Sequence, residues 1–246
     1  MSHPALSDDQ LAIEIAEKAG KLLLDIQQSG LDGKELGKAG DEKANRLIID
    51  MLKLHRPDDA ILSEEEKDNA DRLKAHRVWI VDPLDGTREY GEKRTDWAVH
   101  IALSINKQPT LGAVALPGLG LVLSSGNPLK LPAGNTPPKL LVSRTRPAPD
   151  ALQVAEKLGA ELLPMGSAGA KAMAVVRGEA DIYLHSGGQY EWDNCAPAAV
   201  AKAAGLHVSR ADGSPLIYNE ENPYLPDLLI CRPEWAEKVL AAQRDA

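Results

Sequence analysis

Apolar residues recur at helical spacing in the first part of the chain. Ser7 and Gln10 have the three-residue spacing of a capping box, and the apolar positions that follow repeat every three or four residues until Gly30. A second pattern of this kind runs from about Asp41 to His55. The sequence therefore predicts two amphipathic helices ahead of the first strand.

Short apolar runs bounded by turn residues follow, and these patterns indicate strands. The run at 78–81 should be buried, and Pro83 and Gly86 should turn the chain directly after it. Further strands are predicted at 97–105, 110–116, 121–123, 140–142, 182–184 and 228–230, and further helices at 151–158, 167–177, 193–204 and 234–242. Asp193 should cap its helix, which would leave Pro197 harmlessly in the first turn.

Residues 124–138 are rich in Ser, Gly, Asn and Pro and form the clearest boundary in the chain. We predict an N-terminal α+β half over residues 1–126, a linker over 127–138 and a C-terminal α/β half over 139–246. The expected fold class is therefore α/β, with the α+β half packed on the α/β half.

Composition narrows the function classes. The 246 residues carry a net charge of −8, which argues against a binder of nucleic-acid polymers. Two cysteines do not make a disulfide framework, which favours a reducing cytoplasm. Residues 1–4 show no signal-peptide pattern, and no apolar run is long enough to span a membrane.

Candidate functional residues are most concentrated in the motif Asp82-Pro83-Leu84-Asp85-Gly86-Thr87, at a strand end. Hard cations favour carboxylate and carbonyl oxygens in such an irregular turn. The alternative for the hexapeptide alone is a solvated Asp-Pro/Asp-Gly turn. Two further acidic segments, Ser63-Glu64-Glu65-Glu66 and Trp192-Asp193, are each weak signals, since charge runs are commonly solvated and Asp is a common helix cap.

Together, in this order, the three segments resemble the lithium-sensitive, magnesium-dependent phosphatase superfamily of inositol monophosphatases, fructose-1,6-bisphosphatases and bisphosphate nucleotidases. The resemblance covers residues from about 8 to about 235 and is strongest to the bacterial CysQ-type 3′-phosphoadenosine 5′-phosphate phosphatases. It implies a five-layer αβαβα sandwich with the active site between its halves.

The resemblance also implies the metal ligands. Glu64 would bind a first ion, Asp82 would bridge it to a second, and the Leu84 carbonyl would complete the first shell. Asp85 and Asp193 would hold the second ion. Mg²⁺, as two or three ions, suits this all-oxygen set, and the absence of Cys and His from these segments argues against zinc.

Gly86 and Thr87 should begin a short helix whose backbone N–H groups face a phosphate oxygen. Thr87 would orient the attacking water, with Asp41 or Glu64 as the acceptor of its proton. The family has an Asp 23 residues before the first metal-binding Glu, and 64 − 41 = 23 here. Lys38 stands where the family has Thr, and the alternative for Asp41 is a first-turn acid favoured by the helix dipole.

Substrate choice is expected from the second half. Ser167 and Lys171 lie in a segment that resembles the family's pocket lining, and a Lys at 171 suits a second phosphate. Arg144 resembles a residue of the nucleotide bisphosphatases, and Gln189 offers a donor and an acceptor to a purine. The alternative is that Lys171, Arg144 and Arg146 are ordinary surface cations. His100, within a strand, is expected to be structural.

These observations predict a Mg²⁺-dependent hydrolase that removes the 3′-phosphate of 3′-phosphoadenosine 5′-phosphate, and also of the corresponding 5′-phosphosulfate, in sulfate assimilation. Asp41, Glu64 and Thr87 are the predicted catalytic residues. Substrate contacts are assigned to Asp85, Gly86, Thr87, Arg144, Ser167, Lys171, Gln189 and Asp193. The rivals are inositol monophosphatase or fructose-1,6-bisphosphatase activity, and a non-catalytic metal-binding or scaffolding protein. The expected partner is a small phosphorylated molecule, with no membrane, and a homodimer is the family's habit.

Overall fold

The computed structural model describes residues 6–244, so residues 1–4, expected to carry no signal peptide, lie outside it. The helices are α1 (Asp8–Gln27), α2 (Gly33–His55), α3 (Thr87–Gly91), α4 (Pro149–Leu158), α5 (Ala168–Val176), α6 (Glu191–Ala203) and α7 (Pro233–Arg244). The strands are β1 (Ala60–Ser63), β2 (Arg77–Asp85), β3 (Ala98–Ile105), β4 (Gln108–Leu116), β5 (Leu121–Ser124), β6 (Lys139–Ser143), β7 (Glu161–Met165), β8 (Ile182–Tyr190), β9 (His207–Ser209) and β10 (Tyr224–Cys231).

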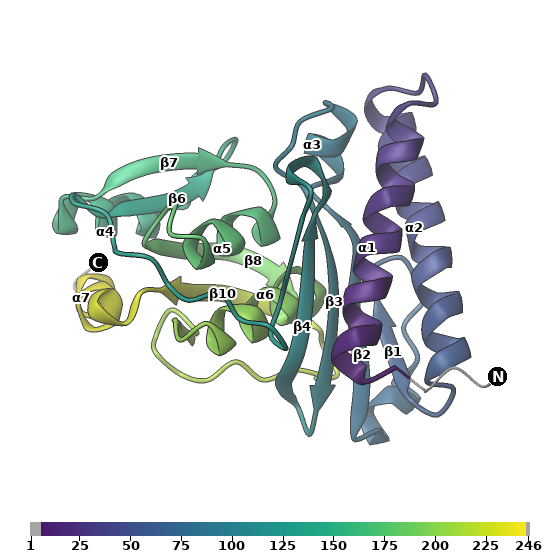
Figure 1. Cartoon of the computed structure of the whole chain (residues 1–246). Coiled ribbons are helices and arrows are strands. Elements are labelled where there is room, and N and C mark those ends of the chain that lie inside the picture. Colours follow the sequence, from purple (N-terminus) through teal and green to yellow (C-terminus); the bar gives the residue numbers. More distant parts are fainter. Residues whose placement is uncertain (1–5, 245–246) are drawn as a thin grey trace.

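These elements stack as five layers. Helices α1 and α2 cover one face of the sheet β1–β5, and α5 and α6 pack on its other face. The same two helices contact the second sheet, whose outer face carries α4 and α7 (Figure 1). The αβαβα sandwich expected from the sequence is therefore confirmed.

The two sheets differ in topology. The first has the order β1-β2-β3-β4-β5 and is antiparallel except for the parallel pair β1–β2. The second has the order β7-β6-β8-β10-β9, in which β6 runs parallel to β7 and β8 while β10 runs antiparallel to its neighbours. Strands β7 and β9 were not predicted from the sequence.

The first two helices illustrate what the sequence pattern did and did not reveal. The Ser7–Gln10 capping box forms, as predicted. The predicted start of the second helix is wrong, because α2 begins at Gly33 and places Asp41 in its interior. Gly37 and Gly40 do not break the helix; a Cβ on either would meet a side chain of the adjoining structure at 2.7–2.8 Å. They allow α2 to lie close against the turn that carries the acidic motif.

Strand β2 also departs from expectation, because it continues through Pro83 to Asp85 instead of ending at the proline. Its pairing with β3 shifts register between Asp82 and Asp85, so Pro83 lies in a bulge, where a missing N–H costs no ladder hydrogen bond. At this end of β2, the bulge changes the direction in which the carboxylates of Asp82 and Asp85 point.

One buried cluster joins the two halves, since Ile80 of the first sheet and Tyr183 of the second belong to the same group of packed side chains. Residues 128–138 carry no helix or strand. The proposed division of the chain at this segment stays a prediction. Within residues 6–244, no helix combines the length and the apolar character needed to cross a bilayer.

Candidate active site

Three carboxylates from the two halves converge between the sheets. One oxygen each of Asp82 and Asp85, at the end of β2, and of Asp193, in α6, lie within 4.8 Å of one another. Asp82 is 1% exposed and accepts a hydrogen bond from the Leu84 backbone N–H at 2.9 Å. The sequence-predicted pairing of the first acidic motif with Asp193 is thus reproduced in space.

The turn after β2 depends on Gly86. Its φ of 88° lies in the left-handed region, which non-glycine residues seldom adopt. A Cβ at this position would also stand 3.0 Å from the Cβ of Ser167. Gly86 precedes the first residue of α3, Thr87, so the short helix predicted here forms, with its first N–H groups beside the acidic cluster.

Asp85 is held by the second half of the chain. Its carboxylate accepts hydrogen bonds from the Ser167 hydroxyl at 2.6 Å and from the backbone N–H groups of Ala168 at 3.1 Å and Gly169 at 2.6 Å. Burial acts to raise the pKa of Asp85, but these donors and the facing His100 ring outweigh it and hold the pKa at about 2. Asp85 is therefore a fixed anion.

His100 is a site residue that the sequence analysis did not assign to the site. Its Nδ1 lies 3.0 Å from the Trp192 carbonyl oxygen, to which it must donate, and its buried Nε2 lies 3.2 Å from Asp85 Oδ2. The latter contact is not aligned as a hydrogen bond, so we treat it as a contact between charges. Although burial opposes it, Asp85 raises the pKa of His100. Sequence alone gave no signal of this role, because the position of His100 opposite Asp82 is a property of the observed β2–β3 register.

The remaining acids are crowded by like charges. Desolvation and the neighbouring Glu64 raise the pKa of Asp82 well above its usual range. Glu64 is exposed as a whole, but its carboxyl is close to Asp82, and desolvation and Asp193 raise its pKa to about 7. Desolvation and Asp85 likewise raise that of Asp193 to about 6. Such a set is stabilised when cations replace the missing positive charge, so these residues fit a site for divalent ions.

Asp41 and Thr87 meet at the edge of this cluster. Desolvation and the charges of Glu65 and Glu64 raise the pKa of Asp41 to about 8, and a hydrogen bond with Thr87 acts in the opposite direction. The Thr87 hydroxyl has one proton, which it can donate either to Asp41 or to the Leu84 carbonyl oxygen, 3.2 Å away. Asp41 reaches this position from the helix interior, so the first-turn explanation of this residue is wrong.

Comparison with known proteins supports this geometry. The sequence profile described as the inositol monophosphatase family matches residues 7–246. The chain belongs to the inositol monophosphatase family. Members of this family are metal-dependent, in keeping with the acidic cluster.

Two curated proteins that are similar to this chain are both 3′-phosphoadenosine 5′-phosphate phosphatases. The one from Mycobacterium leprae is 48% identical, over 98% of this chain and 94% of that protein. The one from Mycobacterium bovis is 51% identical, over 93% of this chain and 90% of that protein. Among solved structures, CysQ from Bacteroides thetaiotaomicron aligns with a TM-score of 0.79 at 26% identity, covering 92% of this chain and 97% of that one.

Helix α6 places Asp193 differently from the sequence prediction. The N-cap is Tyr190, whose backbone N–H donates to Asp193 Oδ2 at 2.6 Å, so Asp193 is the third helical residue and not the cap. Pro197 consequently lies in the helix interior, not in its first turn. The proline removes the N–H that would otherwise bind the Asp193 carbonyl oxygen.

Beside the carboxylates, this inositol monophosphatase-family protein has a cavity of about 560 Å³, hereafter the substrate cavity. Asp85 and Asp193 line it together with four cationic side chains, Arg88, Arg144, Arg146 and Lys171. The structure thus brings the predicted cations Arg144 and Lys171 to the same cavity as the acidic cluster, and Arg88 joins them without having been predicted.

Two predicted substrate contacts already have protein partners. Arg144 Nη2 donates to Glu89, in α3, at 2.9 Å and to Glu92, the residue after α3, at 2.8 Å. The Gln189 amide donates to the Tyr183 hydroxyl and accepts from Asn194. The substrate roles of Arg144 and Gln189 therefore stay predictions, and each would have to share its polar atoms with a ligand.

Proposed function

We propose that this protein is a Mg²⁺-dependent phosphatase that removes the 3′-phosphate of 3′-phosphoadenosine 5′-phosphate, giving AMP and phosphate. The observation that carries the proposal is the composition of the substrate cavity. Asp85 and Asp193 of the acidic cluster line it together with cations, Lys171 among them. A substrate with two phosphates, one for the metal ions and one for the cations, matches this composition.

The similarity to the mycobacterial phosphatases over almost the whole chain supports the same substrate. We further propose that the corresponding 5′-phosphosulfate is a second substrate and that the enzyme serves sulfate assimilation in the cytoplasm. Both cysteines are buried and free, as suits a reducing compartment.

Glu64, Asp82, Asp85, Asp193 and the Leu84 carbonyl would hold two or three Mg²⁺ ions, which when bound neutralise phosphoryl charge and acidify a water molecule. The chain itself then has three tasks. The N–H groups that follow Gly86 orient the phosphoryl oxygens. The Thr87 hydroxyl positions the attacking water. Asp41 receives its proton through Thr87, and the burial of this carboxyl raises its pKa, which favours uptake of a proton.

Lys171 is the residue that we propose to bind the second phosphate. It is 5% exposed, and its ammonium donates to the carbonyl oxygens of Gly166 and Ser167, each at 2.6 Å. Burial lowers its pKa to about 8, so it is largely charged at neutral pH. A buried ammonium held in place by two carbonyl groups loses little freedom when a phosphate binds.

A substrate panel tests the proposal. Adenosine 3′,5′-bisphosphate, inositol 1-phosphate and fructose 1,6-bisphosphate are compared by kcat/KM with Mg²⁺, with chelator, and after Mg²⁺ is restored. We expect the nucleotide to be preferred and chelation to abolish turnover. Preference for inositol 1-phosphate or fructose 1,6-bisphosphate would reject the nucleotide assignment, and no turnover of any substrate would favour a metal-binding scaffold.

A further inference from the structure

A buried arginine joins the two halves of the chain. Arg72, in the short 3₁₀ helix Ala70–Lys74 that follows β1, is 2% exposed, although every residue from 64 to 70 is exposed. Its Nη1 donates to Asn219 Oδ1 at 2.8 Å and to the Glu220 carbonyl oxygen at 3.0 Å, and Asn219 Nδ2 donates to the Arg72 carbonyl oxygen at 2.9 Å. The segment after β1 is therefore bonded to the loop that precedes β10.

Arg72 also binds the segment that begins with Glu64. Its Nε and Nη2 donate to the two oxygens of Asp68 at 2.6 and 2.8 Å, the bidentate geometry in which arginine–carboxylate pairs are strong and directional. Residues 64–69 are turn and irregular backbone, so their conformation depends on side-chain contacts such as this one. Asp68 thereby fixes the end of a segment whose start carries Glu64.

The loop that receives Arg72 is itself fixed to the helix that carries Asp193. Glu191, the first residue of α6, is 1% exposed, and its carboxylate accepts hydrogen bonds from the backbone N–H groups of Asn219 at 2.6 Å and Glu220 at 2.8 Å. Asn219 has a φ of 56°, in the left-handed region that Asn adopts more readily than most residues. Arg72 is thus connected to a residue two positions before Asp193.

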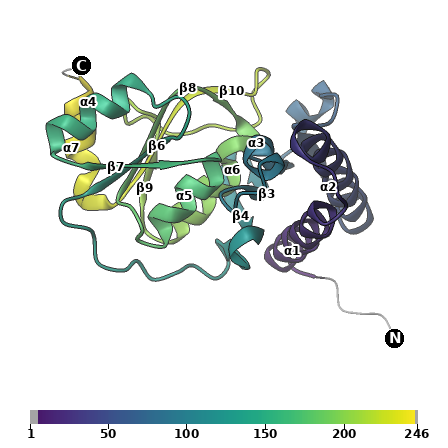
Figure 2. The same ribbon diagram turned by 90° about the horizontal axis from the view of Figure 1, so that it is seen from above.

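This connection links acidic residues that come from separate parts of the fold. Seen from above, α1 and α2 lie at one end of the molecule and α4 and α7 at the other, with α6 between them (Figure 2). Strand β2 supplies Asp82 and the turn after β1 supplies Glu64, while α6 supplies Asp193. The hydrogen bonds of Arg72 therefore join, through residues 219–220, the turn that carries Glu64 to the helix that carries Asp193.

Glu64 is held less firmly than the other side chains proposed as metal ligands. Asp82 and Asp85 are buried at the end of a paired strand, and Asp193 lies in the first turn of a helix. Glu64 is exposed and lies in a turn, where its backbone N–H reaches the Val81 carbonyl oxygen at 3.4 Å. In the metal-free protein, charged carboxylates nearby repel it toward solvent. The position of Glu64 therefore depends on what holds its turn.

Two anchors hold this turn. At its start, Asn45 of α2 accepts a hydrogen bond from Ser63 Oγ at 2.8 Å and donates one to Glu66 at 2.7 Å. This anchor lies within the first half of the chain. At its end, Arg72 binds the turn to the second half. Because Glu64 must stand at the right distance from the ligand in α6, the anchor at Arg72 is the one that sets this relation.

Resting on the proposed metal ligands, we propose that Arg72 is a positioning residue for Glu64. It keeps the turn after β1, in the metal-free protein, where Glu64 can share a divalent cation with the ligand in α6. When Arg72 is removed, cation binding must also order the turn, and this ordering lowers the affinity. At saturating Mg²⁺ the turn is ordered again, so the loss falls on Mg²⁺ affinity and not on kcat.

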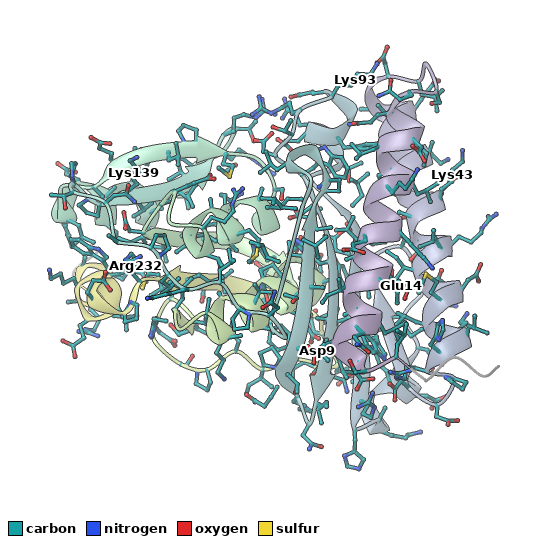
Figure 3. The ribbon with its side chains drawn as sticks, in the orientation of Figure 1. Asp9, Glu14, Lys43, Lys93, Lys139 and Arg232 are labelled. Carbon is teal, nitrogen blue, oxygen red and sulfur yellow. The ribbon has the colours of Figure 1, made fainter. Side chains whose placement is uncertain are left out.

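Calorimetric titration with Mg²⁺ measures the affinity of the wild-type protein, of Arg72→Met and of Glu64→Gln. The control is Arg232→Met. Arg232 is likewise a buried arginine, 8% exposed, whose guanidinium contacts a carboxylate near in sequence, that of Glu234, and a distant backbone carbonyl, that of Pro132. It directly precedes α7, in the outer part of the second half, and does not line the substrate cavity (Figure 3).

We expect Arg72→Met to lower Mg²⁺ affinity by roughly 2- to 30-fold, the range for residues that act on a site without touching its ligand. The affinity of Arg232→Met should equal that of the wild type, and kcat at saturating Mg²⁺ should be preserved in both variants. Unchanged affinity in Arg72→Met, or an equal loss in Arg232→Met, would overturn the proposal.

A second variant keeps the test decisive if Arg72→Met does not fold. Asp68→Ala removes a carboxylate that is 42% exposed and leaves the bonds between Arg72 and Asn219 in place. It frees the segment after Glu64 from its anchor, so Mg²⁺ affinity should fall in the same direction. If Arg72→Met is unfolded, unchanged affinity in Asp68→Ala would overturn the proposal.

The double variant Glu64→Gln/Arg72→Met separates positioning from general support of the fold. Once the Glu64 carboxylate is gone, loss of Arg72 should change Mg²⁺ affinity little, whereas independent effects would add. Additive losses would reject the positioning role and leave the proposed function intact. Unchanged affinity in Glu64→Gln alone would instead reject Glu64 as a ligand in the proposed function, and the role of Arg72 with it.

Discussion

His100 Nε2 lies 3.2 Å from Asp85 Oδ2, with the imidazole wholly buried between β3 and α5. The ring occupies space that only a glycine at position 169 leaves free, because a Cβ there would overlap Nε2. The charge contact with His100 and the absence of a side chain at Gly169 together fix the orientation of Asp85, a proposed metal ligand.

We therefore expect His100→Gln to lower Mg²⁺ affinity or activity by roughly 10- to 100-fold, as is usual for partners that orient metal ligands. Gly169→Ala should have a similar effect by displacing the ring. Calorimetric titration with Mg²⁺ measures the affinity. His207→Gln is the control, since His207 contacts Ser209 in β9. Unchanged affinity in both site variants would show that Asp85 is held well enough by Ser167 and the α5 amides.

Thr87→Val tests the proposed orientation of water. The Thr87 methyl group packs against Gly37, where a built Cβ would stand 2.7 Å away, so Val keeps this contact and deletes the hydroxyl. We expect kcat to fall by roughly 10²- to 10⁴-fold with little change in KM, since the hydroxyl acts on the attacking water.

Steady-state kinetics on adenosine 3′,5′-bisphosphate separate the two parameters, and Thr87→Ser should restore much of kcat. A rise in KM alone would make Thr87 a residue of substrate binding.

The turn that carries the first acidic motif was predictable from local signals, whereas the sandwich and the placement of Asp193 in the same cluster followed only from the resemblance that the three segments carry together. Asp82, Asp85 and Thr87 share one turn, and the strand before them is apolar throughout. The extent of α2 was not predictable in the same way. Gly37 and Gly40 weaken helix propensity, and only the close approach of Thr87 and Tyr90 explains them.

His100 shows a second limit of the sequence. A histidine in a buried strand has no distinguishing pattern, and its role follows from a contact with a residue on the neighbouring strand and with Trp192 far along the chain. The start of α6 was misjudged for a related reason. Asp193 does cap a backbone N–H, but it does so from inside the helix by reaching back to Tyr190.

Without metal, stability should fall as the pH rises. The pKa of Asp41 is raised from 3.8 to about 8, so between these values the folded protein holds more protons than the unfolded chain. The contribution of Asp41 to stability is complete at a pH below 3.8, and it is lost as the pH rises through about 8. Asp82 and Glu64 act in the same direction. The lowered pKa of Asp85 makes stability rise with pH, but only in the pH range between about 2 and 3.8.

Thermal unfolding of the chelated protein at pH 5 and pH 8 measures this effect, and each kcal/mol should move Tm by about 2–4 °C. Mg²⁺ should raise Tm more at pH 8 than at pH 5. Asp82→Asn should flatten the pH dependence of the chelated protein and lower kcat by roughly 10²-fold or more, the scale for loss of a key electrostatic group. A chelated wild-type protein that is more stable at pH 8 would contradict the proposed crowding of acids.

Lys171→Met separates the candidate substrates. Among the described residues its ammonium donates to two carbonyl groups, which leaves one N–H for a ligand. A charge-assisted contact contributes roughly 1.5–3 kcal/mol, so kcat/KM for adenosine 3′,5′-bisphosphate should fall by about 10- to 150-fold. Inositol 1-phosphate, which has no second phosphate, should be affected far less.

Both substrates are measured with both proteins at one ionic strength, because charge contacts near the surface are screened by salt. Since burial lowers the pKa of Lys171 to about 8, the wild-type preference for the nucleotide should also decline above that pH, and the variant should lack this decline. Equal losses on the two substrates would instead mean that Lys171 supports the Gly166–Ser167 backbone, and through Ser167 the position of Asp85, without reading a second phosphate.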